Sequence, residues 1–255
     1  ITRNYFPENH PVTCSILYQQ ARLYQIQQKY DEANVIFTLI ISIISMAYGE
    51  SHPEVGLYVI GQSNNYLLLG NYVEAKISAQ RGLQIFNKVY GSDHPNTIRA
   101  LLCIAKSLYQ SGKYSKSLPY FQRALDFMLR TFPKEDGPHL LVSECYYELG
   151  QCLIALGKFN EAKENFILSL EMRRTILTND HIDTLYAWSL CGETDKYLGN
   201  ITEAEQIQKQ ILYLLPNILH IKLSLFQALV MCRLGNTIEK KGKFNQSKQF
   251  YDRSL

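Results

Sequence analysis

Histidines are the most regularly spaced residues of this chain that could bind a metal ion or transfer a proton. Five of the six stand 18 residues before a turn position in a repeating unit. These five are His10, His52, His94, His139 and His181. Successive units are separated by at least one helix diameter, about 10 Å, whereas nitrogen ligands approach zinc to about 2.0–2.1 Å. We therefore interpret the series as helix-start residues and expect no metal ion and no cofactor.

No other arrangement of reactive residues predicts catalysis. The chain contains no phosphate-binding loop, no nucleophile elbow and no His-Glu-x-x-His motif. Ser92, Asp93 and His94 are adjacent in the sequence, but a catalytic triad requires a specific tertiary placement rather than adjacency. We expect a protein that is not an enzyme.

Composition restricts the compartment and the partners. The six cysteines are scattered without a Cys-x-x-Cys pair, which is typical of free thiols in a reducing compartment. The N-terminus lacks a signal-peptide pattern, and we expect a cytoplasmic protein. A net charge of +3 without a run of basic residues argues against nucleic-acid binding. Because Leu255 stops inside a repeat, we expect a piece of a longer protein.

The segment from Val35 to Ala47 is nearly all apolar and uncharged. A membrane span needs about 20 such residues, and this segment has 13. We expect no membrane span but a buried helix. The alternative is a docking face for a preceding repeat, a missing domain or a second copy of the chain.

A recurring motif provides the elements that would position these residues. Gly-Asn-Tyr-Val-Glu-Ala begins at Gly70, and five related motifs lie along the chain; counted from the first at Gln28, successive motifs are 42, 42, 45, 42 and 43 residues apart. The turn positions are Gln28, Gly70, Gly112, Gly157, Gly199 and Gly242. A period in this range indicates stacked units that each pack only on their neighbours. We predict repeats at about 10–51, 52–93, 94–136, 137–180, 181–219 and 220–255, the last one truncated.

Each unit is predicted to contain two helices joined by the turn. In the second unit, Pro53 suits the first helical position, and Ser51 could supply a capping oxygen. Small residues recur seven before and five after each turn position, where two helices must come close. These twelve positions are Ala21, Ser63, Ala105, Gly150, Gly192, Gly235, Ala33, Ala75, Ser117, Ala162, Ala204 and Ser247.

The combination of a small residue, a six-residue gap and Gly-x-aromatic-x-x-small resembles the tetratricopeptide repeat (TPR). The strings YGESHPEV and YGSDHPNT narrow the resemblance to the 42-residue, kinesin-light-chain-like subclass. This resemblance implies an all-α fold, a right-handed α-α superhelix of about six helix-turn-helix repeats. Residues 1–255 would then form a single TPR array.

The resemblance also implies that the first helix of each repeat lines a concave groove that binds peptides. Its positions lie ten, six and three residues before each turn, and the middle position is always polar. Amide side chains there can donate and accept hydrogen bonds with an extended peptide. The predicted peptide-binding residues are Tyr18, Arg22, Gln25, Asn64, Arg99, Lys106, Tyr109, Glu144, Tyr147, Gln151, Glu193 and Asn236. The wider set of groove positions also includes Ile60, Ser189 and Lys196.

Charge along these positions predicts the polarity of a ligand. Arg22, Arg99 and Lys106 make the first half basic. Glu144, Glu148 and Glu193 make the second half acidic. A peptide with an acidic part and a basic or polar part would match, since complementary charge aids encounter and orientation.

Three functions are compatible with these features. The first is a scaffold that binds a short extended peptide, or a partner helix, in the groove. The second is a sensor or regulatory arm of a larger protein, such as a signalling ATPase, with catalysis in a missing domain. The third is self-association through Val35 to Ala47. Kinesin light chains carry paired asparagines in several repeats, whereas this chain has only Asn64-Asn65, so motor-cargo binding stays open.

Overall fold

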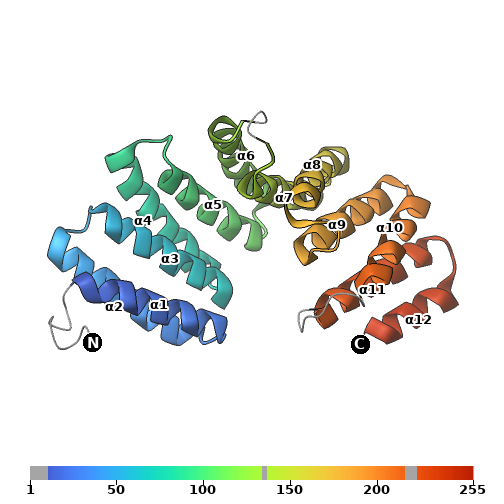
Figure 1. The fold of residues 1–255 in the computed structure, drawn as a ribbon, viewed down its shortest axis with the longest axis horizontal. Helices are drawn as coiled ribbons and strands as arrows, with labels where there is room; N and C mark the ends of the chain where they lie inside the picture. The colour runs from blue at the N-terminus through green and yellow to red at the C-terminus, as the bar shows by residue number, and fades with distance from the viewer. Residues whose placement is uncertain (1–10, 134–136, 216–222, 255) are drawn as a thin grey trace. The chain divides into compact units, whose positions relative to one another are not determined.

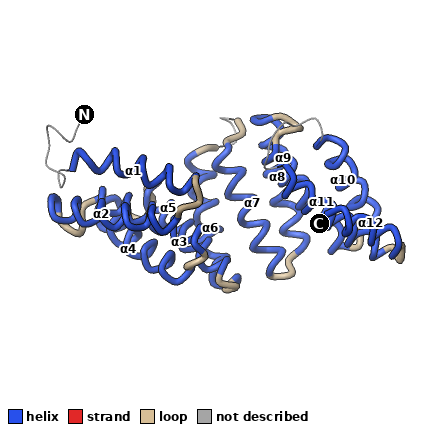
Figure 2. The backbone as a smooth tube through the Cα atoms, turned by 90° about the horizontal axis from the view of Figure 1, so that it is seen from below, coloured by secondary structure: helices blue, strands red, loops and turns tan. Residues whose placement is uncertain are grey.

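Helices are the only regular secondary structure in the residues that the computed structural model describes, which are 11–133, 137–215 and 223–254 (Figures 1 and 2). The helices are α1 (Pro11–Ile26), α2 (Tyr30–Tyr48), α3 (Pro53–Leu69), α4 (Tyr72–Tyr90), α5 (Pro95–Gln110), α6 (Tyr114–Thr131), α7 (Leu140–Ala155), α8 (Phe159–Leu177), α9 (Ile182–Leu198), α10 (Ile201–Leu214), α11 (Leu223–Lys240) and α12 (Phe244–Ser254). The predicted all-α class and the predicted helix-turn-helix pairs are confirmed.

The chain divides into two compact units, residues 1–127 and 128–255, and the boundary falls within α6. In the first unit α1 to α5 pack in chain order, each on the next. In the second unit α7 to α12 pack in the same way. Contacts between sequence neighbours dominate both units, as a repeat fold requires.

The predicted turns are present between the paired helices. Gly70 ends α3 in the left-handed conformation, with φ 78° and ψ 7°, and its N–H donates to the Leu67 carbonyl. A side chain is disfavoured at such an angle, which explains the glycine at five of the six turn positions. The first repeat has Gln28 there instead, and it adopts φ 60°.

Histidine, rather than the residue before it, caps the first helix of a repeat. Nδ1 of His52 accepts a hydrogen bond from the Glu54 N–H at 3.3 Å. The prediction that Ser51 caps this helix was wrong, because the imidazole of His52 occupies the capping position itself. The same bond recurs at His94, His139 and His181. His10 lies outside the described residues.

Three of these histidines contact an aromatic residue at the end of the second helix of the preceding repeat. The ring of His94 stacks on Tyr90 with centroids 4.0 Å apart. His52 lies against Tyr48, and His139 stacks on Phe132 at 3.7 Å. Each pair joins the end of one repeat to the start of the next.

The predicted small positions bring paired helices close enough for side chains to reach the opposite backbone. The hydroxyl of Ser63 on α3 donates to the Ala75 carbonyl on α4 at 2.7 Å. A Cβ atom added at Gly150 on α7 would lie 2.7 Å from the ring of Phe166 on α8. That distance is too short for a carbon contact, so a larger residue at Gly150 would force the helices apart.

The apolar segment within α2 is mainly a core element of the first unit. By length and composition, α2 is the one helix in the described residues that could span a membrane. Ile36, Phe37, Ile40, Ile41, Ile43 and Ile44 of α2 are buried in the unit's core. Val35, Leu39 and Met46 stay exposed on its outer face.

Candidate functional site

The predicted peptide-binding residues of the first unit lie on α1, α3 and α5, and none of them is fully buried. Tyr18 packs edge-on against Phe37 and Tyr58, with ring centroids 6.0 and 5.7 Å apart. Arg22 and Arg99 are exposed, while Lys106 and Tyr109 are half-buried. The accessible side chains of this set are polar, basic and aromatic.

The two asparagines of the Asn64-Asn65 pair have different surroundings. Asn65 is buried, donates to the Tyr30 carbonyl at 2.8 Å and accepts from Gln25 Nε2 at 3.1 Å. It therefore ties the second repeat to the first. Asn64 is exposed, and its Oδ1 lies 3.3 Å from Cys103 Sγ on α5. Of the two asparagines, only Asn64 is exposed.

In the second unit an open cleft of about 390 Å³ lies between α7 and α9, and we name it the α7–α9 cleft. It contains the predicted residues Glu144 and Tyr147, and Gln151 hydrogen-bonds to the Tyr147 side chain. Its lining residues are Leu140, Glu144, Tyr147 and Glu148 from α7, Arg173 from α8, and Asp183 and Tyr186 from α9. The cleft thus combines carboxylates, aromatic rings and one arginine.

Arg173 is the central buried charge of this cleft, with only 7% of the residue exposed. Its Nε donates to Ser143 Oγ at 3.0 Å, and its Nη1 donates to the Asp183 carbonyl at 2.7 Å. The guanidinium carbon lies 4.7 Å from the centre of the Tyr147 ring. Burial lowers the pKa of the Arg173 side chain, while Tyr147 and the nearby carboxylates oppose that shift.

Arg173 is not among the residues predicted from the sequence, although the repeat register contains a signal for it. The residue stands 16 positions after its turn glycine, Gly157. The same position in the other repeats is apolar and buried, with Ile44, Phe86, Met128 and Leu215. The partner position changes as well, because Ser143 replaces Gly56, on which Phe86 packs. A guanidinium thus occupies a core position that other repeats fill with hydrocarbon.

The second unit is less acidic around α9 than the sequence suggests. Glu193 forms an ion pair with Arg233 Nε on α11 at 2.7 Å, and Lys196 Nζ lies 4.0 Å away. Burial lowers the pKa of Lys196, and Glu193 opposes that shift. Glu193 is therefore offset by two cations, and Glu144 and Glu148 line the α7–α9 cleft.

Three positions of the wider set are buried and cannot meet a ligand directly. Ile60 belongs to the core of the first unit. Ser189 is fully buried and donates to Gln208 Oε1, and the Lys196 side chain is 7% exposed. The middle position of each repeat is accessible throughout, and Asn236 is exposed on α11.

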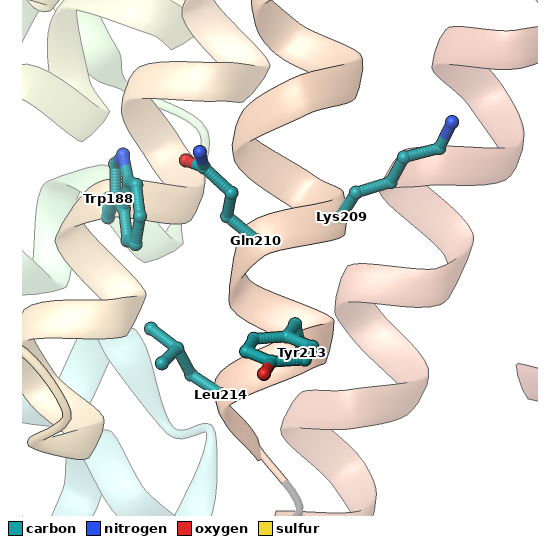
Figure 3. A pocket seen from close by; sticks show the side chains of 5 residues that line it. All are labelled: Trp188, Lys209, Gln210, Tyr213 and Leu214. Carbon is teal, nitrogen blue, oxygen red and sulfur yellow. The ribbon is translucent and has the colours of Figure 1, made fainter.

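A second hollow in this unit is apolar and was not expected from the sequence. It lies between α9 and α10 and is lined by Trp188, Lys209, Gln210, Tyr213 and Leu214 (Figure 3). Trp188 and Leu214 lie on the same side of it, whereas Lys209 points away from Trp188 (Figure 3). The Arg174 guanidinium lies 5.0 Å from the Trp188 ring.

In the described ranges no cluster of three His, Cys, Asp or Glu could hold a metal ion.

Known proteins share this fold. No curated protein sequence matches the chain. A putative kinesin light chain from Podosopora anserina with nearly identical TPR-like repeats is 19% identical, with a TM-score of 0.69 over 80% of this chain and 95% of that one. A Rap protein complexed with Competence and Sporulation Factor is 14% identical, with a TM-score of 0.63 over 93% and 72%.

A third similar structure is a Signal Transduction ATPase with Numerous Domains (STAND) protein with a TPR sensor from Pyrococcus horikoshii. It is 17% identical, and the TM-score is 0.71 over 98% of this chain but only 36% of that one. A family model of the tetratricopeptide repeat matches residues 57–130 and 141–216, which is more than half of the chain. With its helix pairs, turn glycines and small contact residues, the chain belongs to the tetratricopeptide repeat family, which is generally a non-enzymatic protein-interaction fold.

Proposed function

We propose that this chain is a non-enzymatic scaffold that binds a short extended peptide, or a partner's helix, through the exposed face of its first helices. The observation that carries the proposal is the accessible polar row at the middle positions. These residues are Arg22, Asn64, Lys106, Gln151, Glu193 and Asn236. Their register relative to the turns is constant, so one kind of contact repeats along each unit.

The chemistry of the row suits a peptide backbone. Asn64 and Gln151 carry amides that donate and accept hydrogen bonds at once. Neighbouring aromatic rings such as Tyr18 and Tyr109 provide apolar contacts for the side chains of the ligand. Arg22, Arg99 and Lys106 favour an acidic segment in the first unit, and Glu144 and Glu148 favour a basic or polar segment in the second.

A second candidate function is a sensor or regulatory arm of a larger signalling protein. The similarity to a STAND protein that carries a TPR sensor supports this candidate, because the chain would correspond to one part of such a protein. The two functions differ in one measurable property. A scaffold binds its peptide as the isolated chain, whereas a sensor arm binds weakly by itself and changes the activity of an attached domain.

Selection from a random peptide library displayed on phage tests the proposal. We expect enrichment of a sequence motif whose binding weakens as salt rises, since exposed charges contribute. Joint replacement of Arg22, Arg99 and Lys106 by Met should weaken binding and flatten the salt dependence. If folded chain enriches no peptide, or if the triple variant binds with an unchanged salt dependence, the proposal is wrong.

A further inference from the structure

Two positions in the first helix of a repeat contact the repeat before it. They lie 12 and five residues before the turn position, and in the second repeat they hold Tyr58 and Asn65. The ring of Tyr58 lies 5.7 Å from that of Tyr18 on α1. Asn65 donates to the Tyr30 carbonyl at the start of α2. These two positions are therefore part of the surface on which successive repeats stack.

The first repeat exposes both of these positions, whereas the later repeats bury them. The third to sixth repeats have Ala100, Cys145, Ala187 and Val230 at the one position and Ser107, Cys152, Thr194 and Thr237 at the other, all at most 3% exposed. The first repeat has Ile16 and Leu23, which are 49% and 58% exposed. A stacking surface made of hydrocarbon is thus open to solvent on α1.

The second helix adds a third apolar residue at the same edge. The arginines that stand 11 residues after the turn in α4 and α6 reach back to the preceding repeat. Arg81 forms an ion pair with Glu50, and Arg123 donates to the Ser92 carbonyl at 3.2 Å. In α2 this position is held by Leu39, which is 44% exposed.

Ile16, Leu23 and Leu39 form what we name the α1–α2 face, and this face has little charge around it. The only charged residue of α1 is Arg22, and the only ones of α2 are Asp31 and Glu32 in its first turn. Such a face offers almost no charge by which to select an acidic or a basic partner. Its natural complement is a second uncharged apolar surface.

The last repeat does not offer that complement. Positions three before, six after and ten after the turn face the following repeat, because Gln25, Asn34 and Thr38 bond there to side chains of α3. The last repeat has exposed charged residues at these positions, namely Glu239, Lys248 and Asp252. Covering them with the α1–α2 face of another copy would remove charges from water and pair them with hydrocarbon. Head-to-tail stacking of copies is therefore unfavourable.

We propose that two copies of this chain associate through their α1–α2 faces, related by a twofold axis. Twofold symmetry brings the same patch of both copies together and closes the assembly at two. An uncharged apolar face satisfies this arrangement without any second surface. Ile16 and Leu23 then become covered, as the equivalent positions are in the other repeats. The proposal adds an assembly to the scaffold and does not depend on what the first helices bind.

Sedimentation equilibrium of the chain, at concentrations up to about 100 μM to include weak contacts, tests the proposal. We expect the mass to rise to twice 29.4 kDa and no further. Leu23→Glu should weaken the dimer at least about tenfold, because it places a charge in an apolar contact. Ile77→Glu on α4 is the matched control and should leave the dimer unchanged, since Ile77 is 59% exposed and lies outside the face.

Leu39→Glu provides a second variant on the other helix of the face, with the same expected effect. Urea midpoints establish that each variant is folded. A chain that stays monomeric at every concentration would overturn the proposal. A mass that grows beyond two copies would overturn it in favour of open stacking. A dimer that resists both Leu23→Glu and Leu39→Glu, or that Ile77→Glu weakens equally, would place the contact on another surface and also overturn it.

Discussion

The Arg173 guanidinium lies over the ring of Tyr147, 4.7 Å from its centre, in a core position that other repeats fill with apolar side chains. Replacing a whole buried ion pair by hydrophobic residues is often neutral or stabilising, whereas removing one bonded member alone is destabilising. Arg173→Met removes one donor each from the Ser143 hydroxyl and the Asp183 carbonyl, and it should therefore lower the free energy of unfolding by about 1–3 kcal/mol.

Arg173→Ala is the matched comparison and should lower stability, because it leaves a cavity as well as removing the charge. Urea denaturation of both variants gives the two values. An unchanged or higher free energy of unfolding in Arg173→Met would contradict the cost assigned to the two lost hydrogen bonds.

The histidine caps should contribute measurably to folding stability where successive repeats meet. His94→Ala removes the Nδ1 acceptor for the Asn96 N–H and the stack on Tyr90. We expect a loss of about 1–2 kcal/mol, typical of a helix cap with an added ring contact. His94→Asn keeps a capping oxygen and should recover part of the loss. Equal losses in the two variants would assign the whole effect to the ring.

Glycine in place of Thr178 should raise the stability of the folded chain. Thr178 ends α8 at φ 85° and ψ 167°, a conformation that Gly91 adopts at the end of α4. A β-branched residue there is strained by about 1–3 kcal/mol. Thr178→Gly should raise the urea midpoint, and Gly91→Thr should lower it. An unchanged or lower midpoint in Thr178→Gly would contradict the assigned strain.

Close packing between α7 and α8 makes a compensating pair of substitutions testable. Gly150→Ala places a methyl group 2.7 Å from the Phe166 ring and should cost about 1–3 kcal/mol. Adding Phe166→Leu should make room for this methyl group. The double variant should therefore lose less stability than the sum of the losses of the two single variants. Additive losses would show that the two residues do not share one contact.

Thiol reactivity should follow burial rather than bulk pH. Burial raises the pKa of Cys103 to about 11 and that of Cys191 to about 12, where Asp195 adds to the shift. Their thiolates stay scarce when pH rises from 7.5 to 9.5, and the thiolate is the reactive form. Mass spectrometry after brief alkylation should find Cys232, which is partly exposed, labelled first. Rapid labelling of Cys103 in folded chain would contradict the buried placement.

The sequence predicted the repeating elements because each depends on local residues. Turn glycines, small contact residues and the polar middle positions recur at fixed spacing, so the register alone locates them. The caps were misassigned at Ser51, since the role of His52 depends on Tyr48 in the preceding helix. The α7–α9 cleft was missed because it depends on a single departure from the register, Arg173, and on side chains from three helices.

Self-association through Val35 to Ala47 stays a prediction, and burial changes which variants test it. Ile40 and Ile43 belong to the core, so a charge at either would unfold the first unit rather than report on association. Leu39 and Met46 are exposed and are the appropriate sites for Glu substitutions.

Binding of a selected peptide to matched variants of the first and second helices tests the central claim most directly. One variant combines Asn64→Ala with Lys106→Met on α3 and α5, and the control combines Gln84→Ala with Lys88→Met on the exposed surface of α4. We predict at least about tenfold weaker binding for the first variant, equivalent to about 1.4 kcal/mol, and native affinity for the control. Equal affinities for both variants, with urea midpoints unchanged, would contradict peptide binding by the first helices.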